Sequence, residues 1–246
     1  MADSLRTLAE NRGLPFIEDF DAVHLAPEAY TDEKIFRLLD RYAESYGEGL
    51  VLYGGLTATE RVFGLKRIRE ITTDLDFVCS DRGLEAVLEG ERVRYLAKYD
   101  ILYTVSDNVP ITFSYGHIHD WRVSRDFTEK ARVVCPSSVP LRCSSREYSI
   151  MLKMRRTNDR IRRGLAPFGK DALDIVNILV APAFKPDFGR VDGEALRDLV
   201  LSEVTADKAR IGSILRFVAG YRIHLNEAEF AAFAPIFRGI GELFGL

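Results

Sequence analysis

The chain has 246 residues, 47% hydrophobic and 29% charged, which is typical of a globular protein and excludes a disordered one. Its formal net charge of -3 excludes a surface that is basic throughout but leaves room for a local basic face. The N-terminal residues lack the apolar core of a signal peptide, and no apolar run reaches the ~20 residues of a membrane span. We therefore expect a cytoplasmic protein without a membrane partner.

The first regular elements are a helix and a strand. A helix is predicted from about Asp32 to Tyr46, because Ile35, Leu39 and Tyr42 recur on one stripe. The apolar run Leu50 to Tyr53 that follows predicts a buried strand.

A glycine pair ends this strand. Gly54 and Gly55 allow the backbone to approach a ligand closely, and Thr57 can cap a helix that opens at Ala58 and ends near Phe63. A helix N-terminus at this position offers N–H donors to a phosphate. The stretch lacks the Gly-Lys-Ser/Thr ending of a P-loop and the third glycine of a dinucleotide motif, which disfavours both.

Two carboxylates follow on a second predicted strand, Thr72 to Val78. Asp74 and Asp76 are two residues apart, so both side chains point to the same face of this strand. Like charges this close favour a cation between them, and carboxylate oxygens are preferred ligands of Mg²⁺ or Mn²⁺. Taken alone, the pair would favour a solvated edge strand with acids on its wet face, and the neighbouring Gly54-Gly55 shifts the balance toward a metal site.

The pattern from Val93 to Ile118 predicts strands, with a hairpin turn at Asp107-Asn108. A second strand pair is predicted at 131–134 and 139–143. The polar residues His117, His119 and Asp120 lie between these two regions, and their spacing could be that of a metal-binding motif. No other His or Cys pair supports zinc, so we expect them to line a cleft or close a strand end.

Residues 144–163 predict a strongly basic helix. Ser144 and Glu147 have the spacing of a capping box, and Lys153, Arg156 and Arg160 recur on one face. From Arg142 to Lys170 there are nine Lys or Arg residues and two acids, a local charge of +7. Such a face can be ordinary solvated surface, but its density in an acidic protein favours contact with a polyanion.

The next predicted helix, Lys170 to Val180, carries Asp171 and Asp174 three residues apart on one face. Three further amphipathic helices are predicted at 194–201, 206–221 and 227–244. These patterns predict an α+β fold, with an α/β core over residues 1–143 and a helical domain over residues 144–246.

The order of Gly54-Gly55, Asp74-Leu75-Asp76, Lys153 and Asp174 resembles the nucleotidyltransferase superfamily of DNA polymerase β. Within it, the chain looks most like the AbiEii-type toxins of bacterial toxin–antitoxin systems, including the MenT-like enzymes. The resemblance implies a polymerase β-like core with a mixed or antiparallel sheet and flanking helices. It also implies a metal-dependent transfer of a nucleotide from an NTP.

Site roles are carried over by position. The resemblance gives metal binding to Asp74 and Asp76, and catalytic roles to these two, Lys153 and Asp174. It implies that the nucleotide-binding residues are Gly54, Gly55, Thr57, Thr72, Lys153 and Asp171, and that Arg155, Arg156, Arg160, Arg162 and Arg163 contact the acceptor.

Two departures from the family pattern affect these roles. The usual Gly-Gly-Thr appears as Gly-Gly-Leu-Thr, which moves Thr57 by one residue. The third carboxylate of the superfamily has no match on the strand Ile111 to Ile118, which leaves Asp120 as the nearest candidate. The general base would then come from the metal, the substrate or Asp174.

The expected function is therefore the transfer of NMP from an NTP to the 3′ end of an RNA such as tRNA, by a toxin-type enzyme with a cognate antitoxin. Two alternatives remain open. The acceptor hydroxyl can instead belong to a small molecule or a protein, or the chain can be a catalytically silent nucleotide- or RNA-binding protein of the same fold.

Overall fold

We analysed the protein in a computed structural model. The structure describes residues 4–20, 32–58, 74–118, 121–123, 127, 131–134, 139–180, 208–221 and 225–243. The chain divides into two compact units, each treated by itself below. The sheet unit comprises Met1–Thr57 and Ile71–Ser144, and the helical unit comprises Ala58–Glu70 and Ser145–Leu246. None of the helices in the described ranges is long and apolar enough to cross a membrane.

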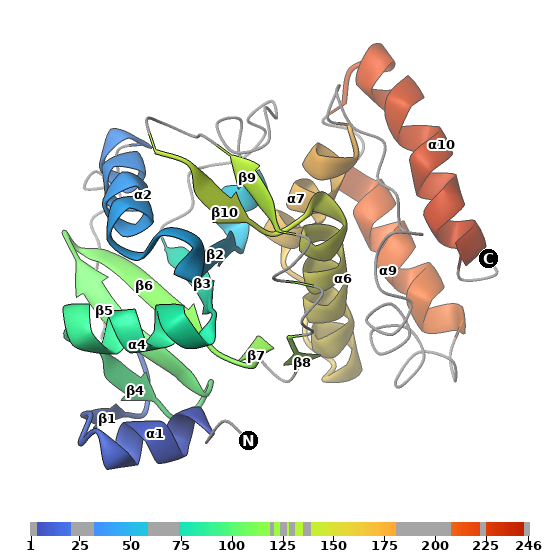
Figure 1. The fold of residues 1–246 in the computed structure, drawn as a ribbon. Coiled ribbons are helices and arrows are strands. Elements are labelled where there is room, and N and C mark those ends of the chain that lie inside the picture. Colours follow the sequence, from blue (N-terminus) through green and yellow to red (C-terminus); the bar gives the residue numbers. More distant parts are fainter. Residues whose placement is uncertain are drawn as a thin grey trace. The chain divides into compact units, whose positions relative to one another are not determined.

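The sheet unit is built on one mixed sheet of eight strands (Figure 1). In spatial order, the strands are β1 Phe16–Ile17, β4 Arg94–Leu96, β5 Ile101–Ser106, β6 Val109–Ser114, β3 Leu75–Cys79, β2 Leu50–Tyr53, β10 Leu141–Cys143 and β9 Arg132–Val134. Antiparallel pairs join β4 to β5, β5 to β6, β3 to β2 and β10 to β9, and parallel pairs join β1 to β4, β6 to β3 and β2 to β10. The predicted α+β class is confirmed.

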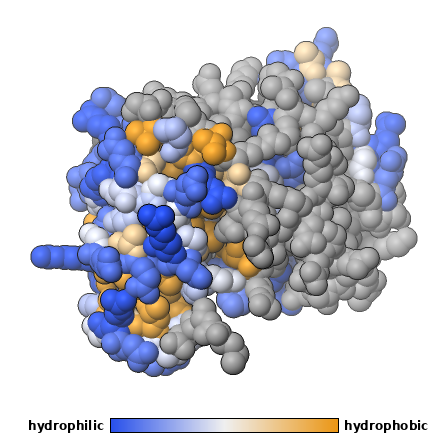
Figure 2. Space-filling model, viewed as in Figure 1, coloured by the Kyte–Doolittle hydropathy of each residue, from blue (hydrophilic) through white to orange (hydrophobic). Residues whose placement is uncertain are grey.

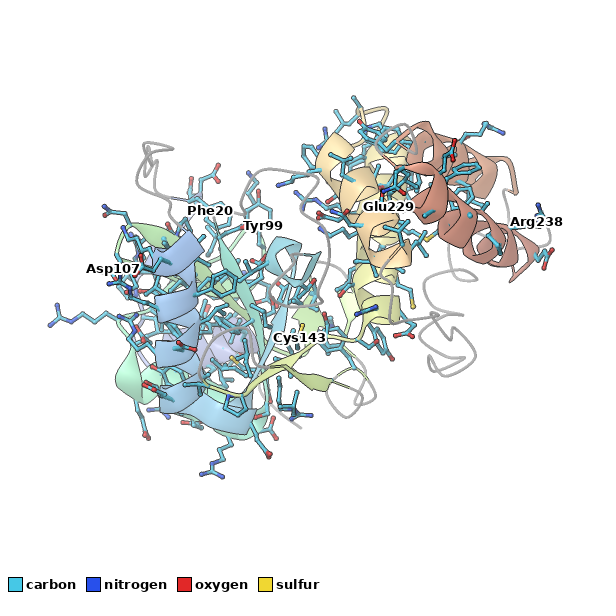
Figure 3. All side chains as sticks on the ribbon, turned by 90° about the horizontal axis from the view of Figure 1, so that it is seen from above. Phe20, Tyr99, Asp107, Cys143, Glu229 and Arg238 are labelled. Carbon is cyan, nitrogen blue, oxygen red and sulfur yellow. The ribbon has the colours of Figure 1, made fainter. Side chains whose placement is uncertain are left out.

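A tight turn joins β5 to β6 as predicted. Asp107 and Asn108 have φ angles of +52° and +63°, which is the two-residue turn whose twist matches that of antiparallel strands. Asp107 is labelled at this turn in Figure 3, which also labels Phe20 and Tyr99. The rings of Phe20 and Tyr99 lie 5.4 Å apart in the same unit.

The helix α2 (Asp32–Tyr46) has the predicted bounds and covers one face of the sheet. Its Tyr42 ring packs 5.6 Å from Phe77 on β3 and 5.9 Å from Phe113 on β6, and all three side chains are buried. Because side chains alternate along a strand, Asp76 points away from α2, to the opposite face.

A close backbone contact fixes the second helix of this layer, α4 (Asp81–Gly90), against the turn η2 (Gly47–Gly49). A Cβ on Gly83 would overlap with the carbonyl oxygen of Gly49, so this position requires glycine. Ser80 caps α4 by accepting a hydrogen bond from the Gly83 N–H at 3.1 Å. The remaining elements are α1 (Leu5–Asn11), β7 (His117–Ile118) and β8 (Trp121–Arg122).

The helical unit contains α6 (Arg146–Arg162), α7 (Gly169–Leu179), α9 (Lys208–Gly220) and α10 (Glu227–Leu243). Both α6 and α9 pack on α7 (Figure 1). The predicted helix at 194–201 lies outside the described residues. The predicted capping box was wrong by one residue: Ser145, and not Ser144, caps α6 by accepting a hydrogen bond from the Tyr148 N–H at 3.3 Å.

Among the described residues, most large hydrophobic side chains are buried inside the two units. On the face shown in Figure 2, the hydrophobic areas are separated by hydrophilic residues. Cys79 and Cys143 are buried free thiols, and Cys135 lies outside the described residues.

Candidate active site

The turn after β2 presses against one of the two predicted metal ligands. Gly54 has a φ of +85°, a conformation that L side chains rarely adopt. A Cβ on Gly54 would overlap with Asp76 Oδ2 and would lie 3.2 Å from the Asp76 Cβ and Cγ atoms. Glycine is therefore required here for two independent reasons, and the backbone of the turn lies directly on the Asp76 carboxylate.

The sheet register sets the position of Asp76. Asp76 pairs with Tyr53 on β2 and with Thr112 on β6, and the Thr112 hydroxyl donates a hydrogen bond of 2.7 Å to Asp76 Oδ1. Asp74 directly precedes β3, and the fully buried Leu75 between the two acids points to the other face. Both carboxylates are half-buried, so they lie on one accessible face, as the alternation predicted.

A pair of hydroxyl groups, those of Tyr53 and Ser114, lies near these carboxylates. The Tyr53 hydroxyl lies 3.0 Å from Ser114 Oγ, within hydrogen-bond distance. Burial raises the pKa of Tyr53, and the nearby negative charges of Asp76 and Asp74 raise it further. The phenol therefore stays protonated beside the carboxylates.

Thr57 lies inside the 3-10 turn η3 (Gly55–Ala58) and not before it. Its side chain is fully buried, and its hydroxyl donates a hydrogen bond of 2.7 Å to the Gly54 carbonyl oxygen. This contact holds the glycine turn closed and gives Thr57 a structural role in the turn. The rest of the helix predicted to end near Phe63, and Thr72, lie outside the described residues.

The neighbouring strand offers a hydroxyl where the family pattern has its third carboxylate. Thr112 on β6 lies next to Asp76, and no acid lies on β6. The other candidate, Asp120, lies outside the described residues, as does His119. Within the described part of the chain, no group of three or more His, Cys, Asp or Glu side chains is placed to hold a metal.

A second cluster lies in the helical unit, between α6 and α7. The Lys153 Nζ lies 2.6 Å from Asp174 Oδ2 and 3.4 Å from Asp171 Oδ1. Both carboxylates are fully buried and Lys153 is 7% exposed, so this is an interior ion cluster. The sequence predicted that Asp171 and Asp174 share a face of their helix, and both face Lys153.

Arg156 extends this cluster toward the surface. Its Nε lies 3.6 Å from the second oxygen of Asp171, and its side chain is 41% exposed. Two cations and two carboxylates thus form one chain of contacts. A buried charge is tolerated when it is paired in this way, and removing one member leaves its partner uncompensated.

The five arginines predicted to contact the acceptor differ in their surroundings. Arg156 and Arg160 lie on the ring of Phe168, whereas Arg162 lies 3.7 Å from Asp159. The Arg155 Nε is buried, and Arg163 is exposed at the C-cap of α6. The sequence could not separate them, because spacing along a helix does not show which cation already has a carboxylate beside it.

The predicted site residues thus fall into two groups. Gly54, Asp74 and Asp76 meet in the sheet unit, whereas Lys153, Asp171 and Asp174 meet in the helical unit. That the two groups share one cleft stays a prediction. Sequence reasoning missed Thr112, although a threonine alternating with the apolar residues of a strand was a usable signal, and it missed Phe168.

No protein-family model matches this chain, and no curated protein matches its sequence.

Proposed function

We propose that this chain is a metal-dependent nucleotidyltransferase, which moves NMP from an NTP to an acceptor hydroxyl. One observation carries the proposal: a glycine turn with positive φ lies directly on Asp76, two residues from Asp74. Such a turn brings backbone close to a bound phosphate without an intervening side chain. The motif order described above is the second support.

The donor set fits Mg²⁺ or Mn²⁺. Mg²⁺ is commonly held by one or two carboxylates together with substrate phosphates, so a third protein ligand is not needed. Asp74 and Asp76 would hold the ion, with Asp76 oriented by Thr112. A bound ion would neutralise the triphosphate charge and polarise the α-phosphoryl group.

The residues of the chain position the substrates. Gly54 and Gly55 would present backbone to the triphosphate, and the resemblance assigns to Lys153 the role of contacting the triphosphate with its ammonium group. Asp174 is buried against Lys153, which favours a role in holding this ammonium over a role as general base. The acceptor oxygen bonds to the α-phosphorus, pyrophosphate leaves, and the hydroxyl proton is released to water.

The acceptor we favour is the 3′ end of an RNA such as tRNA, in a toxin-type enzyme with a cognate antitoxin. The local charge of +7 between Arg142 and Lys170 supports a polyanionic acceptor. The resemblance supports the toxin assignment.

The test is transfer of label from α-labelled NTP to RNA with the double substitution Asp74→Asn and Asp76→Asn. We expect transfer to be lost while circular dichroism stays unchanged, because both side chains are half-buried and keep their shape. Transfer by the double variant at the wild-type rate would refute the proposal. Labelling of total protein or of small hydroxyl compounds, with RNA unlabelled, would reassign the acceptor.

A second candidate is a nucleotide-binding protein that does not catalyse transfer. Thr112 favours it, because a hydroxyl replaces the carboxylate that the family pattern has on the neighbouring strand. Acceptor labelling separates the candidates. By calorimetry, both should bind NTP with Mg²⁺, and the Asp74→Asn variant should bind it more weakly, but the protein that does not catalyse transfer would label no acceptor.

A further inference from the structure

The loop between α6 and α7 gathers three cations around one aromatic ring. The guanidinium carbon of Arg160 lies 3.7 Å from the Phe168 ring centroid, that of Arg156 lies 4.7 Å away, and Lys170 Nζ lies 5.7 Å away. An aromatic face attracts a cation by about 0.5–1 kcal/mol at an exposed site. The ring therefore offsets part of the repulsion among cations and holds them at one place.

Both arginines are anchored through Nε. The Arg160 Nε donates a hydrogen bond of 2.6 Å to the Ala166 carbonyl oxygen, and the Arg156 Nε lies 3.6 Å from Asp171 Oδ2. Within the described residues, no hydrogen bond or ion pair engages the terminal amino groups of either arginine. Each guanidinium group is held at its Nε atom and lies on the Phe168 ring. The edge formed by its two terminal amino groups can therefore face a ligand.

This geometry selects an anion with paired oxygens. A guanidinium edge matches the two non-bridging oxygens of a phosphate, and a preorganised arginine loses little rotamer freedom on binding. Asp171, whose Oδ2 lies 3.6 Å from the Arg156 Nε, is fully buried, so its charge is directed to Lys153 and Arg156 and away from solvent. A second acid, Asp159, lies beside Arg162.

We propose that Arg156, Arg160 and Lys170, arranged on Phe168, form a clamp for the phosphodiester backbone of single-stranded RNA. The clamp rests on the proposed function for the identity of its ligand, since RNA is the acceptor proposed above. A membrane surface is disfavoured because docking there needs several exposed apolar side chains, and Leu165 is the one large hydrophobic residue of this loop known to be exposed, at 48%.

The experiment measures binding of a fluorescein-labelled oligouridylate to the full chain by anisotropy, without NTP and at two salt concentrations. We expect Arg156→Gln and Arg160→Gln each to weaken binding about fivefold to tenfold and to lower the salt slope by about one. Phe168→Leu keeps the apolar volume but removes the ring, and should weaken binding about threefold. Arg160→Lys keeps the charge but loses the planar edge, so its affinity should be intermediate.

The matched control is Arg216→Gln, an exposed arginine of α9 that donates to Ser213 at 3.1 Å. Oligouridylate affinities of Arg156→Gln and Arg160→Gln equal to that of the control would overturn the proposal. The proposal would also be overturned if Arg156→Gln and Arg160→Gln lost binding to phosphatidylserine vesicles but retained binding to RNA. Because the assay contains no NTP, a protein without transferase activity can still show the clamp. Conversely, wild-type transfer to RNA by both variants would reject the clamp and leave the carboxylate assignment standing.

Discussion

The two groups of predicted site residues, one in the sheet unit and one in the helical unit, stabilise their carboxylates in different ways. In the sheet unit, the Thr112 hydroxyl donates a hydrogen bond of 2.7 Å to Asp76. In the helical unit, cations lie against Asp171 and Asp174, which are fully buried. A hydroxyl orients a carboxylate without cancelling its charge, whereas an ion pair cancels it.

This difference separates two tasks. A carboxylate that keeps its charge on an accessible face suits a metal ligand, and its position comes from strand register, which the backbone enforces. A buried carboxylate that is neutralised by Lys153 holds that lysine in place, and its position depends on the charge of its partner. The group in the sheet unit should therefore be sensitive to steric changes, and the group in the helical unit to loss of charge.

The largest expected effect is that of Lys153→Met. Methionine fills similar space but leaves Asp171 and Asp174 buried without the ammonium, so the free energy of unfolding of the helical unit should fall by about 3–5 kcal/mol. Adding Asp174→Asn should restore part of it, because one uncompensated charge is removed. Denaturant titration followed by circular dichroism measures the effect.

The control for this substitution is Lys98→Met in the sheet unit. Lys98 lies 3.3 Å from Asp19, but both side chains are more than half exposed, so we expect little change. The same denaturant titration measures this control. If Lys153→Met and Lys98→Met lowered the free energy of unfolding equally, burial would not explain the strength of the Lys153 ion pairs.

Gly54→Ala tests the close contact between the glycine turn and Asp76 in the sheet unit. The new Cβ meets an unfavourable φ and also the Asp76 carboxylate, so both stability and Mg²⁺-dependent NTP binding should suffer. Gly116→Ala is the matched control, since Gly116 has a φ of +70° but nothing within 4 Å of the added Cβ. We expect about 1–2 kcal/mol for the control and about 1–3 kcal/mol more for Gly54→Ala. Equal losses of stability would show that the contact with Asp76 is relieved easily.

The two serine caps give a smaller comparison. Ser145→Ala removes the acceptor for the Tyr148 N–H of α6 and should cost about 1 kcal/mol. Ser80→Ala removes the α4 cap and also a hydrogen bond of 3.2 Å to the Gly49 carbonyl oxygen, so its cost should be larger. Thermal unfolding of both variants ranks them, and the reverse order would contradict this explanation.

The smallest expected effect is at alkaline pH. Burial, together with the hydrogen bond to Asp81, raises the pKa of Tyr115 from 10.0 to about 12. The folded state therefore favours the neutral phenol, and its contribution is complete below pH 10 and is lost as the pH rises through about 12. Tyr115→Phe should lose less stability than the wild type over this interval, as measured by denaturant titration at each pH. If Tyr115→Phe and the wild type lost the same stability as the pH rises, a group other than Tyr115 would be responsible for the loss.

Much of the fold followed from local patterns. The bounds of α2 and β2, the hairpin turn at Asp107-Asn108 and the pairing of β9 with β10 were all predicted, because periodicity and turn chemistry act over a few residues. The cap of α6 was predicted one residue too early. Ser144 and Ser145 offer the same chemistry, and only the path of the chain after β10 decides between them.

The candidate site was predicted as a set of residues but not as a set of contacts. Residue types and spacing identified Asp74, Asp76, Lys153 and Asp174. They did not show that Thr112 binds Asp76, since β3 and β6 are parallel strands far apart in the chain. Nor did they show the ring of Phe168 beneath two arginines, because the return of the chain into α7 brings it there.

By itself, the sequence determined some of the elements, such as α2 and β2 but not α1 or α4. It also determined the common face of Asp74 and Asp76 and the excess of positive charge on α6. These depend on side-chain alternation, helical periodicity and composition, which are local properties. Tertiary structure alone decided that Gly54 lies against Asp76, that Lys153 is neutralised by two buried acids, and that Arg156 and Arg160 lie on the Phe168 ring. Those outcomes depend on distances between segments far apart in the chain, and such distances are set by packing.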